Sequence, residues 1–276
     1  MKKLIICIIF FSMVGDRCFS QSKSYGNPYG VPDELWETFI KGALLGEEDK
    51  WAEALPYFKT VADKGNVACA QHEVAICYLH GEGIDGSFTE AFKYMYKAAT
   101  NEKPWGSAFA DLGDFYEKGI GTPKSFEEAF KWYYKGPGVE NTPFAIMDER
   151  KIAKCLYKVG IAYLEGKGIQ QDRTQAVSWL IKADEQGYRE AASILAIAYL
   201  SGDMGLEKDD MKGVKWLNRT SLLSDYTPLL YYYKGIVHRD GLGNTPIDKA
   251  EALRMFEMAA GLGYTKALDE IRKLEK

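Results

Sequence analysis

The three histidines, His72, His80 and His238, are the residues of this chain best able to bind a metal or move a proton near neutral pH. No His-x3-His or Cys-x2-Cys pair accompanies them, so the sequence offers no obvious set of zinc ligands. The glycine-rich stretch GEGIDG (81–86) follows a predicted helix rather than a strand, which argues against a dinucleotide-binding loop. We therefore predict no catalytic residue, no cofactor and no metal site.

The cysteines point to packing rather than to cross-links. Cys69 and Cys77 are eight residues apart on one predicted helix, which separates them by about 12 Å, whereas a disulfide needs Cα atoms within about 7 Å. Cys155 lies further along the chain. We predict that all three are free, buried thiols that fill space as small apolar side chains.

The overall charge excludes some classes of partner. The chain has 276 residues, is 27% charged and carries a net charge of −4. Nucleic acids and anionic membrane surfaces are bound by basic patches, which this composition does not suggest. We expect neither nucleic acid nor a metal ion among its partners.

The N-terminus has the three-part layout of a secretory signal, with two lysines, an apolar run and then small residues. The run from Leu4 to Val14 is too short to span a bilayer, which needs about 20 residues. We predict a signal peptide over 1–20, a disordered leader over 21–33, and export to the periplasm or the medium with no integral membrane segment after cleavage. Asp16 and Arg17 fit poorly before a lipidated cysteine, so we favour cleavage near Ser20 over acylation of Cys18.

A short pattern recurs through the rest of the chain. A Gly-x-Gly, or a stretched version of it, is preceded three residues earlier by an aromatic residue and six residues earlier by a small one. The first glycines are Gly81, Gly119, Gly166, Gly202 and Gly241, spaced by 36 to 47 residues. Downstream of each stands a small residue followed three positions later by a large one, at Ala91/Tyr94, Ala129/Trp132, Ala176/Trp179, Gly213/Trp216 and Ala252/Met255.

This spacing predicts pairs of helices. A small residue and a ring three positions apart lie on one helical face, so two such helices can approach closely where the small residues meet, with rings filling the flanks. Glycine takes the left-handed conformation that ends a helix at no steric cost, so each Gly-x-Gly is expected to cap the first helix of a pair. The fold class is predicted to be all-α, and Trp132, Trp179 and Trp216 are expected to belong to the core rather than to a binding platform.

The pattern resembles the Sel1-like repeat, a relative of the tetratricopeptide repeat. The segments 108–136 and 155–184 follow its signature nearly throughout, and 68–99 is close behind. The resemblance implies an α-α superhelix, or solenoid, over 34–276, with units at about 34–65, 66–101, 104–138, 151–187, 188–225 and 226–262. The helix at 263–276 would cap the array, with Ala267, Leu268, Ile271 and Leu274 buried and Glu270 exposed.

The family resemblance also implies a function. Such arrays are adaptors, so we expect a non-catalytic scaffold that binds a protein or peptide in its concave groove. The polar and aromatic residues at inward positions, together with one apolar residue of the insertion at 137–150, are the candidate contacts: His72, Asp114, Glu117, Tyr157, Tyr232, Arg239 and Phe144. The alternative is a cell-wall or β-lactam-binding or hydrolysing protein, like cysteine-rich relatives that close each repeat with a disulfide.

Overall fold

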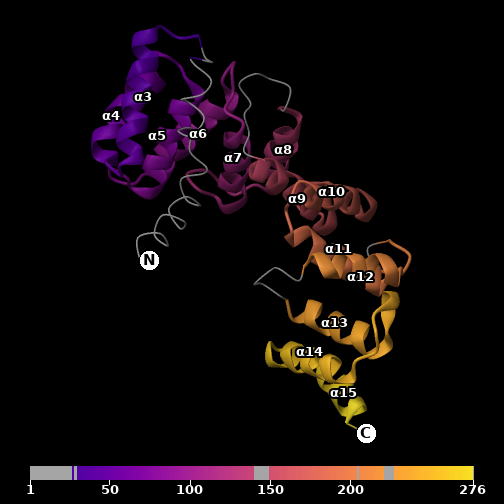
Figure 1. The fold of residues 1–276 in the computed structure, drawn as a ribbon. Helices are drawn as coiled ribbons and strands as arrows, with labels where there is room; N and C mark the ends of the chain where they lie inside the picture. Colours follow the sequence, from indigo (N-terminus) through magenta and orange to yellow (C-terminus); the bar gives the residue numbers. More distant parts are fainter. Residues whose placement is uncertain (1–26, 28–29, 140–148, 204, 221–226, 276) are drawn as a thin grey trace. The chain divides into compact units, whose positions relative to one another are not determined.

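The computed structural model describes residues 27, 30–139, 149–203, 205–220 and 227–275, and within them the chain is helical with no strand. The helices α3 to α15 follow one another in packed pairs (Figure 1), which confirms the predicted all-α class. No described helix is both long and apolar enough to cross a membrane. The predicted signal peptide and Phe144 lie outside the described residues.

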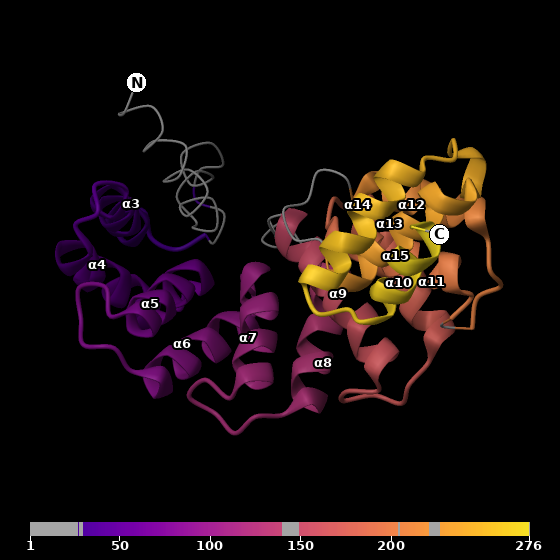
Figure 2. The ribbon, with the colours of Figure 1, turned by 90° about the horizontal axis from the view of Figure 1, so that it is seen from below.

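The chain divides into two compact units, one up to Cys155 and one from Leu156 on. In unit 1 the first helix of each pair alternates with the second, in chain order (Figure 2). The pairs are α3 (Asp33–Glu47) with α4 (Trp51–Lys64), α5 (Ala68–His80) with α6 (Phe88–Thr100), and α7 (Ser107–Lys118) with α8 (Phe126–Lys135), followed by the 3₁₀ turn η1 (Gly136–Val139) and by α9 (Glu149–Glu165), in which the two units meet in sequence.

Unit 2 continues the same alternation. After the end of α9 come α10 (Arg173–Glu185), α11 (Glu190–Ser201), α12 (Asp210–Arg219), α13 (Pro228–Asp240), the 3₁₀ turn η2 (Leu242–Asn244), α14 (Lys249–Gly261) and α15 (Lys266–Leu274). Within this unit α11 packs on α12, α13 on α14, and α15 on α14. Because each helix pair buries one face against the next pair of the same unit, each repeat supports its neighbour there.

The Gly-x-Gly turns end the first helices as predicted. Gly119 caps α7 with φ 75°, in the left-handed region that glycine adopts without strain. The chain then reverses, and six residues after Gly119 the backbone N–H of Ser125 donates to the carbonyl of Tyr116 at 2.9 Å. The Ser125 side chain then accepts from the backbone N–H of Glu128, and this hydrogen bond caps the N-terminus of α8. The same cap and turn recur in the other repeats: Ser87, Asp172, Asp209 and Asp248 cap α6, α10, α12 and α14.

The second glycine of three of these turns, at Gly83, Gly121 and Gly243, packs closely against the preceding repeat. A side chain at Gly121 would clash with the backbone carbonyl of Phe88, at the start of the second helix of the preceding pair. An added Cβ would also be too close to main-chain atoms at Gly83, 2.5 Å from the carbonyl carbon of Trp51, and at Gly243, 2.8 Å from the carbonyl oxygen of Asp210. The turn therefore touches the preceding repeat through main-chain atoms, which only glycine permits.

The small residues of the first helices do not mainly meet small residues, and this part of the prediction was wrong. The open side of Gly113 is filled by the ring of Tyr133, that of Gly235 by the ring of Phe256, and that of Gly160 by the side chain of Leu180. These partners stand four positions after the small residue of the second helix, one turn on from it and on the same face. A glycine groove that receives a large side chain buries more apolar surface than two glycines in contact.

The core is built from the predicted columns. Trp132 and Tyr94 are buried, while Trp179 and Trp216 are half-buried against neighbouring helices. The cysteines Cys69, Cys77 and Cys155 are buried, as predicted.

The burial predicted for the last helix was wrong at two positions. Leu268 is 44% exposed, whereas Glu270 is 7% exposed. The reason is Arg239 of α13, which forms an ion pair with Glu270, so the face of α15 that packs inward carries a carboxylate. Lys273 adds a second ion pair to Glu270 at 2.8 Å.

Candidate functional site

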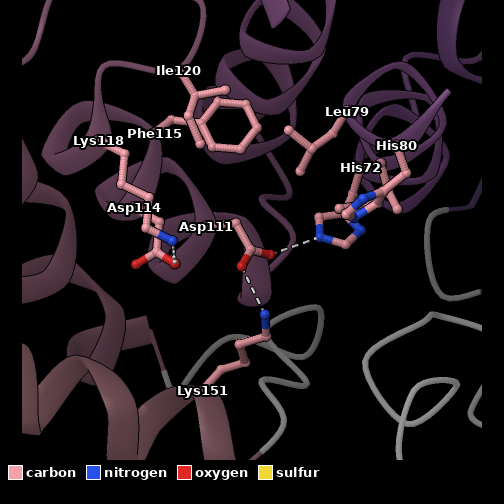
Figure 3. Close-up of a pocket in the computed structure, with 10 residues that line it drawn as sticks. His72, Leu79, His80, Asp111, Asp114, Phe115, Lys118, Ile120 and Lys151 are labelled. Carbon is pink, nitrogen blue, oxygen red and sulfur yellow. Dashed lines mark hydrogen bonds and ion pairs between the residues drawn. The ribbon is translucent and has the colours of Figure 1, made fainter. Parts of the chain in front are cut away.

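A hollow in unit 1 lies between the first helices α5 and α7, close to the start of α9 (Figure 3). It measures about 230 Å³. One wall is apolar, formed by Leu79, Phe115 and Ile120, and charged groups lie opposite it, with Asp111 at their centre. We call this side of unit 1, built from α3, α5, α7 and the first turns of α9, the first-helix face.

Asp111 holds three helices together at the base of the hollow. Its Oδ2 lies 3.0 Å from Nε2 of His72 on α5, and its Oδ1 accepts from Nζ of Lys151 on α9 at 2.7 Å. Nδ1 of His72 faces Oε1 of Glu73 at 3.6 Å. His72 is 2% exposed and Glu73 is fully buried, so these charges interact with little screening by water.

The carboxylates fix the charge of His72. Burial disfavours the imidazolium, but the hydrogen bond to Asp111 and the negative charges of Asp111 and Glu73 outweigh it and raise the pKa of His72 to about 9. Burial also disfavours the Asp111 carboxylate, yet the positive charges of Lys151 and His72 keep its pKa below the usual value. At neutral pH this part of the hollow is therefore a line of alternating, compensated charges.

This arrangement differs from that of a catalytic histidine. A general base needs one ring nitrogen directed at the group that it deprotonates. In His72 both ring nitrogens face carboxylates, so the ring stores a positive charge instead of presenting a base. The described residues contain no group of three or more His, Cys, Asp or Glu side chains placed to hold a metal ion.

A second ion pair lies one helical turn along α7. Oδ2 of Asp114 accepts from Nζ of Lys154 at 2.6 Å, and Oδ1 lies 2.6 Å from the hydroxyl of Tyr133. The same hydroxyl lies 2.7 Å from Oε2 of Glu117. Burial and the adjacent Asp114 raise the pKa of Tyr133 above its usual value, so the phenol stays neutral and donates.

The candidate contacts predicted from the sequence are divided between the two units. His72 and Asp114 both line the hollow, and Glu117 joins them through Tyr133. Their side chains already contact other side chains of this chain, and that of His72 has almost no exposed surface.

The other described candidates lie in unit 2. Tyr157 is stacked on Tyr188 with ring centroids 4.6 Å apart. Tyr232 packs 4.9 Å from the ring of Tyr264, and Arg239 pairs with Glu270 and Asp240. Tyr157 lies on α9, whereas Tyr232 and Arg239 lie on α13, and each has partners of its own, so the set does not form a single site.

Sequence reasoning missed Asp111, Lys118 and Lys151, which complete the charged side of the hollow, and Lys154, which pairs with Asp114. A usable signal was present: two acids three residues apart on α7, Asp111 and Asp114, are matched by two lysines three residues apart on α9. Each acid pairs with the lysine 40 positions later. Residues three apart share a helical face, so the match predicts a ladder of ion pairs between first helices.

Comparison with known families agrees with the repeat pattern. A family model described as Sel1 repeat matches residues 70–102, 108–136, 153–188, 189–225 and 231–264. No curated protein gave a significant match.

Two solved structures share the fold. A Sel1 repeat protein from Oxalobacter formigenes is 26% identical, with a TM-score of 0.65 over 87% of this chain and 88% of that one. A protective antigen present in uropathogenic Escherichia coli strains, which displays an SLR fold, is 23% identical, with a TM-score of 0.67 over 87% of this chain. This chain spans half of that protein, and at this identity the likeness concerns the fold alone.

Proposed function

The chain belongs to the Sel1 repeat family, a scaffold typical of protein–protein interaction, and we propose that it is an exported, non-catalytic adaptor that binds a protein partner on the first-helix face of unit 1. The family match supports the adaptor role. The choice of face is a separate step, which rests on the chemistry of the residues found there.

The observation that carries the proposal is the hollow between α5 and α7. Leu79 and Ile120 are only partly buried there, and they lie beside charged groups from α7 and α9. Apolar surface next to satisfied polar groups is what the centre of a protein interface requires, because the apolar part gains from desolvation while no charge is left unpaired.

Export rests on residues 1–20 alone. The charged start, the apolar run and the small residues that follow are the features that secretion machinery recognises. Fractionation of cells that produce the chain with a C-terminal tag, followed by N-terminal sequencing of the product, tests this part. We expect an exported product that begins near residue 21, and a full-length product inside the cell would contradict export.

The choice of face can be tested by photo-crosslinking. Benzoylphenylalanine placed at Lys118, on the first-helix face, should give a discrete crosslinked partner in cells of the source organism. Lys93 on α6 is a matched control, because both lysines are more than half exposed and each pairs with an acid of its own helix. Adducts from position 93 and none from position 118 would contradict the proposal.

A further inference from the structure

Both carboxylates that line the hollow, those of Asp111 and Asp114, are already paired with other side chains of the chain. Asp111 is bonded through both oxygens, to His72 and to Lys151. Asp114 is likewise bonded through both, to Tyr133 and to Lys154. These contacts measure between 2.6 and 3.0 Å. A basic ligand would have to displace a lysine of the protein from one of them, so the hollow does not favour a cation.

The cation at the rim is in the opposite situation. Nζ of Lys118 lies 3.8 Å from Oδ2 of Asp114, beyond hydrogen-bond distance, and its side chain is 62% exposed. An ammonium group has three N–H donors, so Lys118 can donate a hydrogen bond to an anionic group of a partner without breaking an existing one. His80, exposed at the end of α5, lies across the hollow from it (Figure 3).

The apolar wall lies between these two donors. Leu79 reaches it from α5, Phe115 from α7, and Ile120 from the turn that follows α7 (Figure 3). At about 230 Å³ the hollow is smaller than the roughly 300–1,000 Å³ of typical small-molecule pockets. It therefore suits one large side chain of a partner with an anionic group beside it, better than a whole cofactor or drug-sized ligand.

We propose that this hollow binds an apolar side chain of a partner protein together with a carboxylate carried on the same or an adjacent residue. This inference rests on the proposed function and specifies the chemistry of the partner. The apolar side chain packs on Phe115 and Leu79, and the carboxylate accepts from Nζ of Lys118. The net charge of −4 gives an acidic partner no long-range attraction, so recognition depends on this local donor.

Four short peptides test the inference, with the chain from residue 21 onward labelled with ¹⁵N. They are acetyl-Gly-Glu-Leu-Gly-amide, its Gln and Lys counterparts at the second position, and acetyl-Gly-Gln-Leu with a free C-terminal carboxylate. Titration at millimolar peptide, followed through the backbone amides of Leu79, Phe115 and Ile120, gives an affinity for each. The Glu peptide and the free-carboxylate peptide separate the two sources of the anion.

We expect one or both carboxylate peptides to bind about tenfold more tightly than the Gln and Lys peptides, as one charge-assisted hydrogen bond allows. Lys118→Gln should remove that difference, while Lys93→Gln on α6 should leave it unchanged. If neither carboxylate peptide binds the hollow more tightly than the Gln peptide, the carboxylate preference is overturned and the proposed function still stands. Tighter binding of the Lys peptide, or no response of these amides to any peptide, would also overturn the inference, and the crosslinking test then decides the proposed function separately.

Discussion

Nε2 of His72 and Oδ2 of Asp111, which lie 39 positions apart in the chain, approach to 3.0 Å and join the first helices of two successive repeats. Lys151 extends this contact to a third first helix. A hydrophobic contact at this place would tolerate small slips between the helices, whereas a buried ion pair loses its energy when the geometry changes. The charged chain thus fixes the register of α5, α7 and α9.

The His72–Asp111 pair makes stability depend on pH. The pKa of His72 is raised from 6.5 to about 9 in the folded chain, so its contribution is complete below pH 6.5 and is lost as the pH rises through 9. Glu73, Asp111 and Lys151 are the charged groups that face it. We expect His72→Gln to abolish about 3 kcal/mol of the decrease in unfolding free energy between pH 6 and pH 9.5, measured with urea.

His80→Gln serves as the control for this experiment, because His80 is exposed and lies outside the charged chain. Asp111 affects stability at acidic pH. Its pKa is lowered in the folded chain, so its contribution to the unfolding free energy is complete above its usual pKa and is lost as the pH falls below that value. An unchanged slope between pH 6 and pH 9.5 in His72→Gln would show that the pair does not carry the pH dependence.

The close packing of Gly113 against Tyr133 predicts a large effect from one methyl group. An added Cβ would overlap the Tyr133 ring, which its hydrogen bonds to Asp114 and Glu117 hold in place. We expect Gly113→Ala to lower the unfolding free energy by about 1–3 kcal/mol, because overpacking forces side chains out of their preferred positions. Thermal and urea unfolding measure it.

Gly261→Ala provides the contrast to Gly113→Ala. Gly261 is also helical, as the last residue of α14, but nothing lies within 4 Å of an added Cβ there. Alanine should therefore be neutral or stabilise the protein by up to about 1 kcal/mol through helix propensity. Similar losses in both variants would mean that the two sites are packed alike.

The two glycines of one turn should respond differently to the same change. At Gly119 the nearest atoms to an added Cβ are 3.3 Å away, so Gly119→Ala should cost only the left-handed backbone strain of about 1–2 kcal/mol. At Gly121 the same strain is joined by a clash with the Phe88 carbonyl, which is main chain and cannot rotate away. We expect Gly121→Ala to cost clearly more, and comparable unfolding curves for the two variants would disprove the close contact between repeats.

The thiols of the folded chain should be inert. Cys69, Cys77 and Cys155 are buried, and burial raises the pKa of Cys155 to about 12. In the chain from residue 21 onward we expect no reaction with a thiol reagent at pH 8 over minutes, and three equivalents of reaction after unfolding in guanidinium. Rapid labelling of the native chain would place a thiol at the surface.

The sequence predicted the helix pairs because their signals are local. Glycine at Gly119 and an aromatic residue at Tyr116 act within one turn of helix, and their recurrence identifies them. The capping residues such as Ser125 are equally local, and the Ser-x-x-Glu spacing from Ser125 to Glu128 could have located the start of α8.

Features that depend on a partner from another repeat were harder to predict. Which side chain fills the groove at Gly113 depends on how the two helices are rotated about their axes, and sequence spacing allows more than one answer. Glu270 was expected at the surface because it is charged, yet Arg239 of another helix makes its burial favourable. The hollow itself required Asp111 and Lys151 to be brought together from 40 positions apart.

Binding on the first-helix face is the central claim, and affinity for the partner identified by crosslinking tests it most directly. Lys118→Glu reverses the charge at the rim of the hollow, and Lys93→Glu makes the same change on α6. By isothermal titration calorimetry, we predict at least about a tenfold loss of affinity for Lys118→Glu and none for Lys93→Glu. Unchanged binding by Lys118→Glu together with a loss in Lys93→Glu would place the partner on the second helices and contradict the account.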